Sequence, residues 1–96
     1  MHVLNRKVLD QAVKHHGDLK SPLARWFTIV TQARWRNLTE LRKTFRDTDC
    51  VEGVTIFNIK GNNYRLHAEV NFQAQAVFLR KLETHAEYSK RTGGKT

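Results

Sequence analysis

The chain has 96 residues, enough for one small domain, and carries 17 Lys and Arg against nine Asp and Glu, a net charge of +8. Hydrophobic residues make up 40% of the chain, too many for a disordered protein, and no apolar run approaches the roughly 20 residues that a membrane-spanning helix needs. The single cysteine, Cys50, excludes an internal disulfide and any cysteine-based zinc module. These features predict a basic domain in the cytoplasm, with a polyanion as its partner.

The first half of the chain has the periodicity of helices. Residues 1–5 predict a short strand, and apolar positions at helical spacing predict helices over 6–16 and about 22–35. Ser21 is the expected N-cap of the second helix. Asn37 or Thr39 is expected to cap a third, short helix that runs to about Phe45, and the polar stretch 46–53 is expected to be a connection.

The second half changes to the period of strands. Strands are predicted over 54–59, 64–72 and 76–82, with a hairpin turn at 60–63. In the middle strand Tyr64, Leu66 and every second residue to Phe72 share one face, while the other face carries Arg65, His67, Glu69 and Asn71. The expected fold is therefore α+β, an antiparallel sheet with helices packed on one face and polar side chains on the open face.

Several side chains near the end of the last strand could cleave RNA. RNA cleavage without a metal needs groups that move protons at the 2′-oxygen and the leaving 5′-oxygen, and cations that stabilise the phosphate. Those residue types occur together here: Lys60, Arg65, His85, Glu87, Tyr88 and Lys90. Read alone, the same residues could also form an ordinary solvated face.

The repeated His-Ala-Glu at 67–69 and 85–87 also raises a metal hypothesis. The spacing typical of metal ligands is missing, and we expect no metal site and no other cofactor.

Two stretches, 57–66 and 84–88, resemble the HigB-type toxins of the RelE/ParE superfamily of bacterial toxin–antitoxin systems. Shorter matches occur at 6–9, 22–26 and 33–35, so the resemblance extends in order along nearly the whole chain. It implies one RelE-like domain over residues 1–96, with about 89–96 as a loose basic tail. Asn63 stands where the family usually has Lys, and the chain from Ser89 onward does not match well.

The resemblance implies an mRNA interferase, a metal-independent endoribonuclease that inhibits translation and growth. The implied partners are mRNA, either free or held in the ribosome, and a HigA-like helix-turn-helix antitoxin, with operator DNA bound only through the antitoxin. His85 is the implied proton-transfer group and Arg65 the group that stabilises the phosphate, with Glu87 and Tyr88 beside them. Lys60 and Arg80 are implied to neutralise charge, and the further candidates for RNA binding are His67, Lys90 and Arg91.

Two alternatives remain open at this point. The superfamily also contains toxins that inhibit gyrase by binding and cleave nothing, and His85, Glu87 and Tyr88 favour the nuclease over that function. A non-catalytic basic module that binds RNA would show a steep salt dependence without cleavage products.

Overall fold

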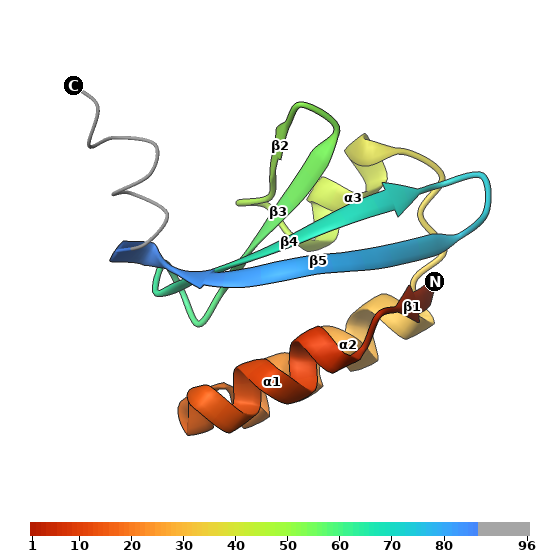
Figure 1. Ribbon diagram of the computed structural model, residues 1–96. Helices are drawn as coiled ribbons and strands as arrows, with labels where there is room; N and C mark the ends of the chain where they lie inside the picture. Colours follow the sequence, from red (N-terminus) through yellow and green to blue (C-terminus); the bar gives the residue numbers. More distant parts are fainter. Residues whose placement is uncertain (87–96) are drawn as a thin grey trace.

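The computed structural model describes residues 1–86, in which helices and a mixed sheet form an α+β domain, as the sequence predicts (Figure 1). The helices are α1 (Lys7–His15), the 3₁₀ turn η1 (Gly17–Leu19), α2 (Lys20–Gln32) and α3 (Leu38–Thr44). The strands are β1 (His2–Leu4), β2 (Asp49–Val51), β3 (Val54–Ile59), β4 (Tyr64–Asn71) and β5 (Ala76–Thr84). None of the helices in the described part of the chain is long and apolar enough to cross a membrane.

The sheet has the strand order β1-β5-β4-β3-β2. Strands β2 to β5 form an antiparallel meander, as expected for 54–82, but β1 joins the edge at β5 in parallel, with Val3 opposite Val77. The expected antiparallel sheet is therefore confirmed over β2 to β5, and β1 adds one parallel pair that the sequence did not predict. At the other edge the prediction is incomplete, because β2 lies inside the stretch that was expected to be a connection.

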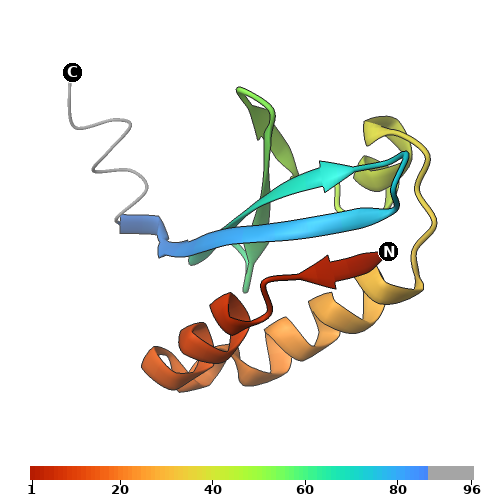
Figure 2. The same cartoon turned by 45° about the vertical axis from the view of Figure 1, so that its right-hand side comes forward.

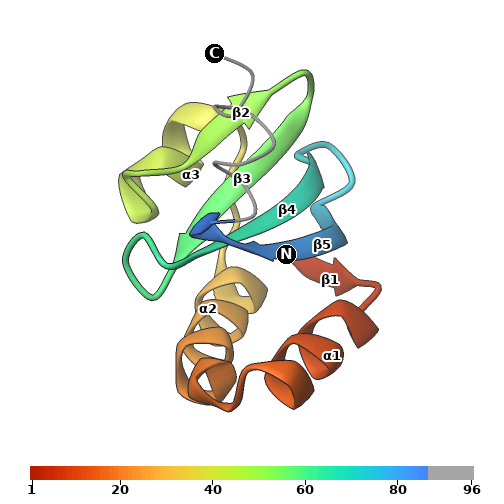
Figure 3. The same cartoon turned by 60° about the vertical axis from the view of Figure 1, so that its left-hand side comes forward.

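Helices α1 and α2 lie side by side against one face of the sheet, as Figures 2 and 3 show from two sides. The apolar stripe of α2 packs into the core, where Trp26 meets Phe57 of β3 edge to face with ring centroids 5.3 Å apart. Helix α3 adds Leu41 and Phe45 to the same core, and Phe45 also meets Phe57 edge to face. All three helices thus contribute to the core on one side of the sheet, and the opposite face carries mostly polar side chains, with the buried Ile56 among them.

Both ends of α2 differ from the sequence prediction, whereas the start of α3 agrees with it. Helix α2 begins at Lys20 rather than after Ser21, because η1 leads directly into it. It ends at Gln32 and does not reach Trp35, and the amino group of Met1 donates to the carbonyls of Val30 and Ala33 at that end. Helix α3 has the expected N-cap: the Asn37 side chain accepts a hydrogen bond from the backbone N–H of Glu40 (2.9 Å).

Candidate functional site

The open face of the sheet carries the alternating polar residues of β4. In the strand register, Arg65 lies between Asn58 of β3 and Glu83 of β5. Because side chains of directly paired residues project from the same face, these three groups are neighbours on the open face. The expected placement of Arg65 is therefore confirmed.

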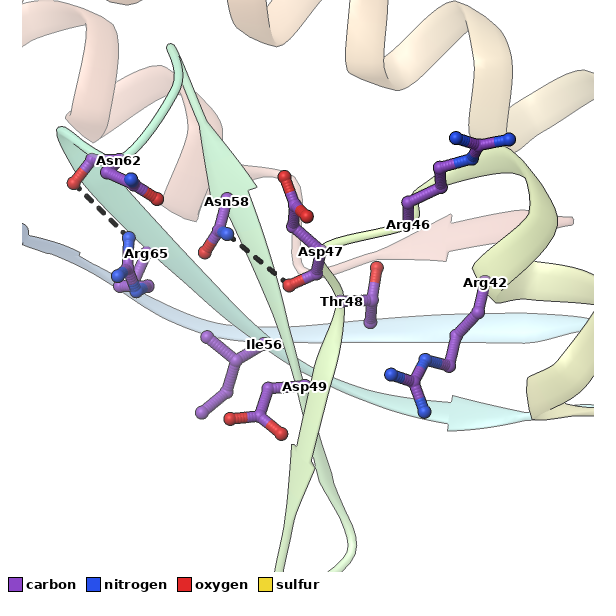
Figure 4. Close-up of a pocket in the computed structure, with 9 residues that line it drawn as sticks. All are labelled: Arg42, Arg46, Asp47, Thr48, Asp49, Ile56, Asn58, Asn62 and Arg65. Atoms are coloured by element: carbon purple, nitrogen blue, oxygen red, sulfur yellow. Dashed lines mark hydrogen bonds between the residues drawn. The ribbon is translucent and has the colours of Figure 1, made fainter.

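A pocket of about 500 Å³ opens beside Arg65, between the sheet and the end of α3 (Figure 4). Its lining residues are Arg42, Arg46, Asp47, Thr48, Asp49, Ile56, Asn58, Asn62 and Arg65. Three arginines outnumber the two aspartates, so the pocket favours an anion that also offers hydrogen-bond donors.

Arg42 and Arg46 are site residues that the sequence interpretation missed. They lie four residues apart, Arg42 in α3 and Arg46 just after it, and each follows a residue that packs in the core, Leu41 and Phe45. Their spacing is visible in the sequence, but the approach of α3 to the sheet is a tertiary contact. Only a basic i, i+4 pair next to a polar connection could have indicated them.

Arg65 reaches the pocket from the second position of β4. Its side chain is half-buried, and its Nη1 donates to the carbonyl of Asn62 in the preceding turn (3.3 Å). Next to Arg65 on the sheet, Asn58 donates from Nδ2 to the carbonyl of Asp47 (3.3 Å), which ties the segment after α3 to β3. These contacts fix two sides of the pocket with backbone acceptors.

His85 lies at the same end of the sheet as the β3–β4 turn. Tyr64 pairs with Thr84 at the end of β5, and the backbone N–H of His85 then donates to the carbonyl of Asn63 (2.7 Å). Arg65, near the start of β4, and His85, just after the end of β5, therefore lie at the same end of the sheet. The His85 residue is exposed to solvent.

Lys60 has a different environment from the pocket arginines. It does not line the pocket, and its Nζ lies 2.7 Å from Oδ2 of Asp18 in η1. The hydroxyl of Tyr64 donates to the same carboxylate (3.2 Å). The hydrogen bond from Lys60 lowers the pKa of Asp18, and the reciprocal contact raises the pKa of Lys60. The pKa of Tyr64 is raised, first by burial and then by its hydrogen bond to Asp18.

Arg80 stands apart from Arg65. It is the extra residue of a β-bulge, because Leu79 pairs with Ala68 and Lys81 with His67. Its Nη1 lies 2.6 Å from Oε2 of Glu69, and it does not line the arginine pocket.

His67 lies on the expected face, but the expectation that it is exposed there is wrong. Only 6% of the residue is accessible to solvent. Its Nε2 lies 3.5 Å from Oε1 of Glu83, and the same oxygen lies 2.9 Å from Nζ of Lys81. A polar side chain on a sheet face can be buried when a polar partner lies next to it, and Glu83 has that position beside His67.

The remaining predicted residues, Glu87, Tyr88, Lys90 and Arg91, lie outside the described residues. Within residues 1–86 no group of three or more His, Cys, Asp or Glu side chains could hold a metal ion. In particular, His67 lies beside Glu83 of β5, and Glu69 of its own strand forms an ion pair with Arg80.

Comparison with known proteins identifies the family of this chain. Residues 19–91 match the model of the HigB toxins, described as the RelE-like toxic component of a toxin–antitoxin system. The chain belongs to this family, and its α+β fold agrees with a RelE-like domain.

Curated relatives match over nearly the whole chain. The mRNA interferase toxin HigB of Escherichia coli K12 is 27% identical over 91 residues, which cover 92% of this chain and 88% of the relative. The mRNA interferase HigB of Shigella flexneri matches with the same identity and coverage. The mRNA interferase HigB of Escherichia coli O6:H1 (strain CFT073) is 22% identical over 95 residues, which cover 96% of this chain and 92% of the relative.

Proposed function

We propose that the protein is an mRNA interferase, an endoribonuclease that cleaves mRNA without a metal and thereby inhibits translation and growth. The observation that carries this proposal is the family match over 19–91, which contains the three pocket arginines and His85. The relatives named above are mRNA interferases, and the arginine pocket offers this chain a site for the phosphate of an RNA strand.

The proposed reaction is attack of a ribose 2′-oxygen on the adjacent phosphorus. The 2′-hydroxyl loses its proton, a new P–O bond forms, and the bond to the 5′-oxygen breaks while that oxygen takes up a proton. Arg65, with Arg42 and Arg46, stabilises the negative charge that builds up on the phosphate, because guanidinium groups donate paired hydrogen bonds to phosphate oxygens. His85 transfers one of the protons.

The other predicted residues keep narrower roles. Glu87 and Tyr88 remain proposed partners of His85 in proton transfer, and Lys90 and Arg91 remain proposed RNA contacts. Arg80 could bind RNA only in competition with Glu69, and the buried position of His67 favours support of the sheet face over direct contact with RNA.

The partners follow from the family at two levels of detail. Membership in a toxin–antitoxin family implies an antitoxin that neutralises this chain. We further propose that the antitoxin is a HigA-like helix-turn-helix protein and that operator DNA is reached only through it. We also propose that the mRNA is cleaved in the cytoplasm, where the ribosome can present it, by a single domain formed by residues 1–96.

Induction of the protein in bacterial cells, followed by primer extension on a reporter mRNA, tests the activity. We expect discrete cleavage sites with the wild type and their loss in Arg65→Ala and in His85→Ala. Arg25→Ala, which removes an exposed arginine of α2 outside the pocket, is the matched control and should cleave like the wild type.

Three outcomes would contradict the proposal in different ways. Growth arrest with intact mRNA and damaged DNA would favour the gyrase-inhibiting alternative. RNA binding without cleavage products would favour the non-catalytic module. Loss of cleavage by the purified protein on addition of EDTA would overturn the metal-independent mechanism.

A further inference from the structure

The β3–β4 turn, residues 60–63, holds both proposed site residues through its backbone carbonyls. Arg65 donates to the carbonyl of Asn62, and the N–H of His85 donates to the carbonyl of Asn63. The turn itself contains Lys60 and Gly61 with φ values of 54° and 66°. A lysine in this left-handed region needs support from its surroundings, because a Cβ there is crowded by the following carbonyl.

That support comes from one carboxylate outside the sheet. Asp18 of η1 binds the Nζ of Lys60 on one flank of the turn and the hydroxyl of Tyr64 on the other (2.7 and 3.2 Å). Tyr64 is almost completely buried and meets the ring of His16 edge to face, so this flank is packed as well as hydrogen-bonded. The carboxylate therefore attaches both flanks of the turn to the helical layer.

From this arrangement we infer that Asp18 is a positioning residue for RNA cleavage, and that Lys60 acts with it to place the turn that holds Arg65 and His85. This inference rests on the proposed nuclease function and changes the role of Lys60. The family resemblance predicts that Lys60 neutralises charge on the phosphate. In the structure the charge of Lys60 is already matched by Asp18, and we infer that Lys60 contributes through the position of the turn.

The chemistry gives the two roles opposite consequences for a charge reversal. If Lys60 acted on the phosphate, an acidic residue at that position would repel the substrate whatever its partner. If the pair only positions the turn, Asp18→Lys combined with Lys60→Asp restores the contact between positions 18 and 60 with the two charges exchanged. The hydroxyl of Tyr64, which donates to the Asp18 carboxylate, then accepts from the ammonium instead. Aspartate also tolerates the left-handed conformation that position 60 requires.

The kinetic test measures cleavage of a labelled reporter mRNA in a bacterial translation extract over a range of mRNA concentrations. We expect Asp18→Asn and Lys60→Ala each to lower kcat by about 10- to 100-fold while KM stays close to the wild-type value, because reacting groups lose alignment. The reversed pair should recover most of the lost kcat. Asp10→Asn, which removes an exposed carboxylate from α1, controls for the change in net charge and should cleave like the wild type.

A second measurement does not depend on activity: hydrogen exchange of the His85 amide, which is bonded to Asn63. We expect faster exchange in Asp18→Asn than in the wild type or Asp10→Asn, and restored protection in the reversed pair. Unchanged exchange in Asp18→Asn would overturn the inference, as would a reversed pair no more active than the single variants. The two proposals can fail separately. If the wild type cleaves nothing, but the His85 amide exchanges faster in Asp18→Asn than in the wild type, the proposed function is contradicted and the positioning contact is still supported.

Discussion

At the scale of single residues, Arg42 and Arg46 extend the site beyond the strands. Both line the pocket together with Arg65, whereas Lys43 of the same helix does not line it. Arg42, Lys43 and Arg46 are all exposed. Variants at these positions can therefore distinguish a local contact with phosphate from a general effect of charge.

We expect Arg42→Ala and Arg46→Ala each to weaken RNA binding and to lower the slope of log K against log salt by about one. Lys43→Ala should change the slope by clearly less, because its side chain does not line the pocket. The measurement is RNA affinity at several salt concentrations, made with His85→Ala as the common background to prevent cleavage while all three pocket arginines are kept. Equal slopes for all three variants would show that the pocket is not where phosphate binds.

Asp18 gives a second prediction at this scale, for stability against pH. Its pKa is lowered in the folded protein from an ordinary value of 3.8, so the stability that its ionised form contributes is fully present above 3.8. That contribution disappears as the pH falls through the lowered pKa. Asp18→Asn should therefore be less stable than the wild type near neutral pH, and the difference should vanish in strong acid.

Denaturant unfolding of the two proteins across the acid range measures this difference. Asp10→Asn is again the reference variant, since Asp10 is an exposed carboxylate of α1 outside the Asp18 contact. A gap between wild type and Asp18→Asn that stays constant down to strong acid would contradict the assignment of the charged contact to Asp18.

At the scale of elements, α3 connects the stability of the domain to the pocket. Its N-cap is Asn37, and the carboxylate of Glu40 in its first turn accepts a hydrogen bond from the backbone N–H of Arg36 (2.7 Å). With seven residues, α3 depends on such end contacts and on the burial of Leu41 more than on its own helix propensity.

We expect Asn37→Ala to lower the free energy of unfolding by about 1 kcal/mol, the usual cost of losing an N-cap side chain. The same variant should weaken RNA binding less than Arg42→Ala does, since it loosens the helix but keeps the guanidinium. Thermal unfolding and RNA affinity measured on the same preparation separate the two effects. Asn37→Asp, which retains a capping oxygen, should have a free energy of unfolding close to that of the wild type.

The sequence was informative about elements whose pattern is long and regular, and weaker elsewhere. The apolar stripe of α2 and the alternation in β4 both correspond to the observed faces, because each pattern extends over several residues. Strand β2 was not predicted because it has only three residues, too few for a periodic pattern. Its signal was the turn after it: Glu52 and Gly53 have φ values of 52° and 81°, the conformation of a tight two-residue hairpin.

The candidate site was predictable only where it depends on a single strand. Alternation in β4 placed Arg65, and the hairpin register followed from the turn at 60–63. The contributions of Arg42, Arg46 and Asp18 depend on how α3 and η1 approach the sheet, and local periodicity carries no information about that approach. The burial of His67 was missed for the same reason, since it depends on Glu83 of the neighbouring strand.

At the scale of the whole molecule, the net charge of +8 exceeds what the pocket alone supplies. The excess is expected to accelerate the encounter with RNA, an effect that salt screens strongly, whereas contacts already made in the pocket are screened less. We therefore predict that kcat/KM falls steeply with ionic strength while the cleavage rate at saturating mRNA changes much less. A parallel decline of both quantities would place the salt effect in the chemical step.

The parallel pairing of β1 with β5 also has a consequence for the order of events during synthesis. Val3 belongs to the first strand to be made and Val77 to the last, so the two can meet only when nearly all of the described chain exists. Contacts between residues so distant in sequence are slow to form. The sheet edge therefore closes late, and a nascent chain lacks its complete fold while its own message is still being translated.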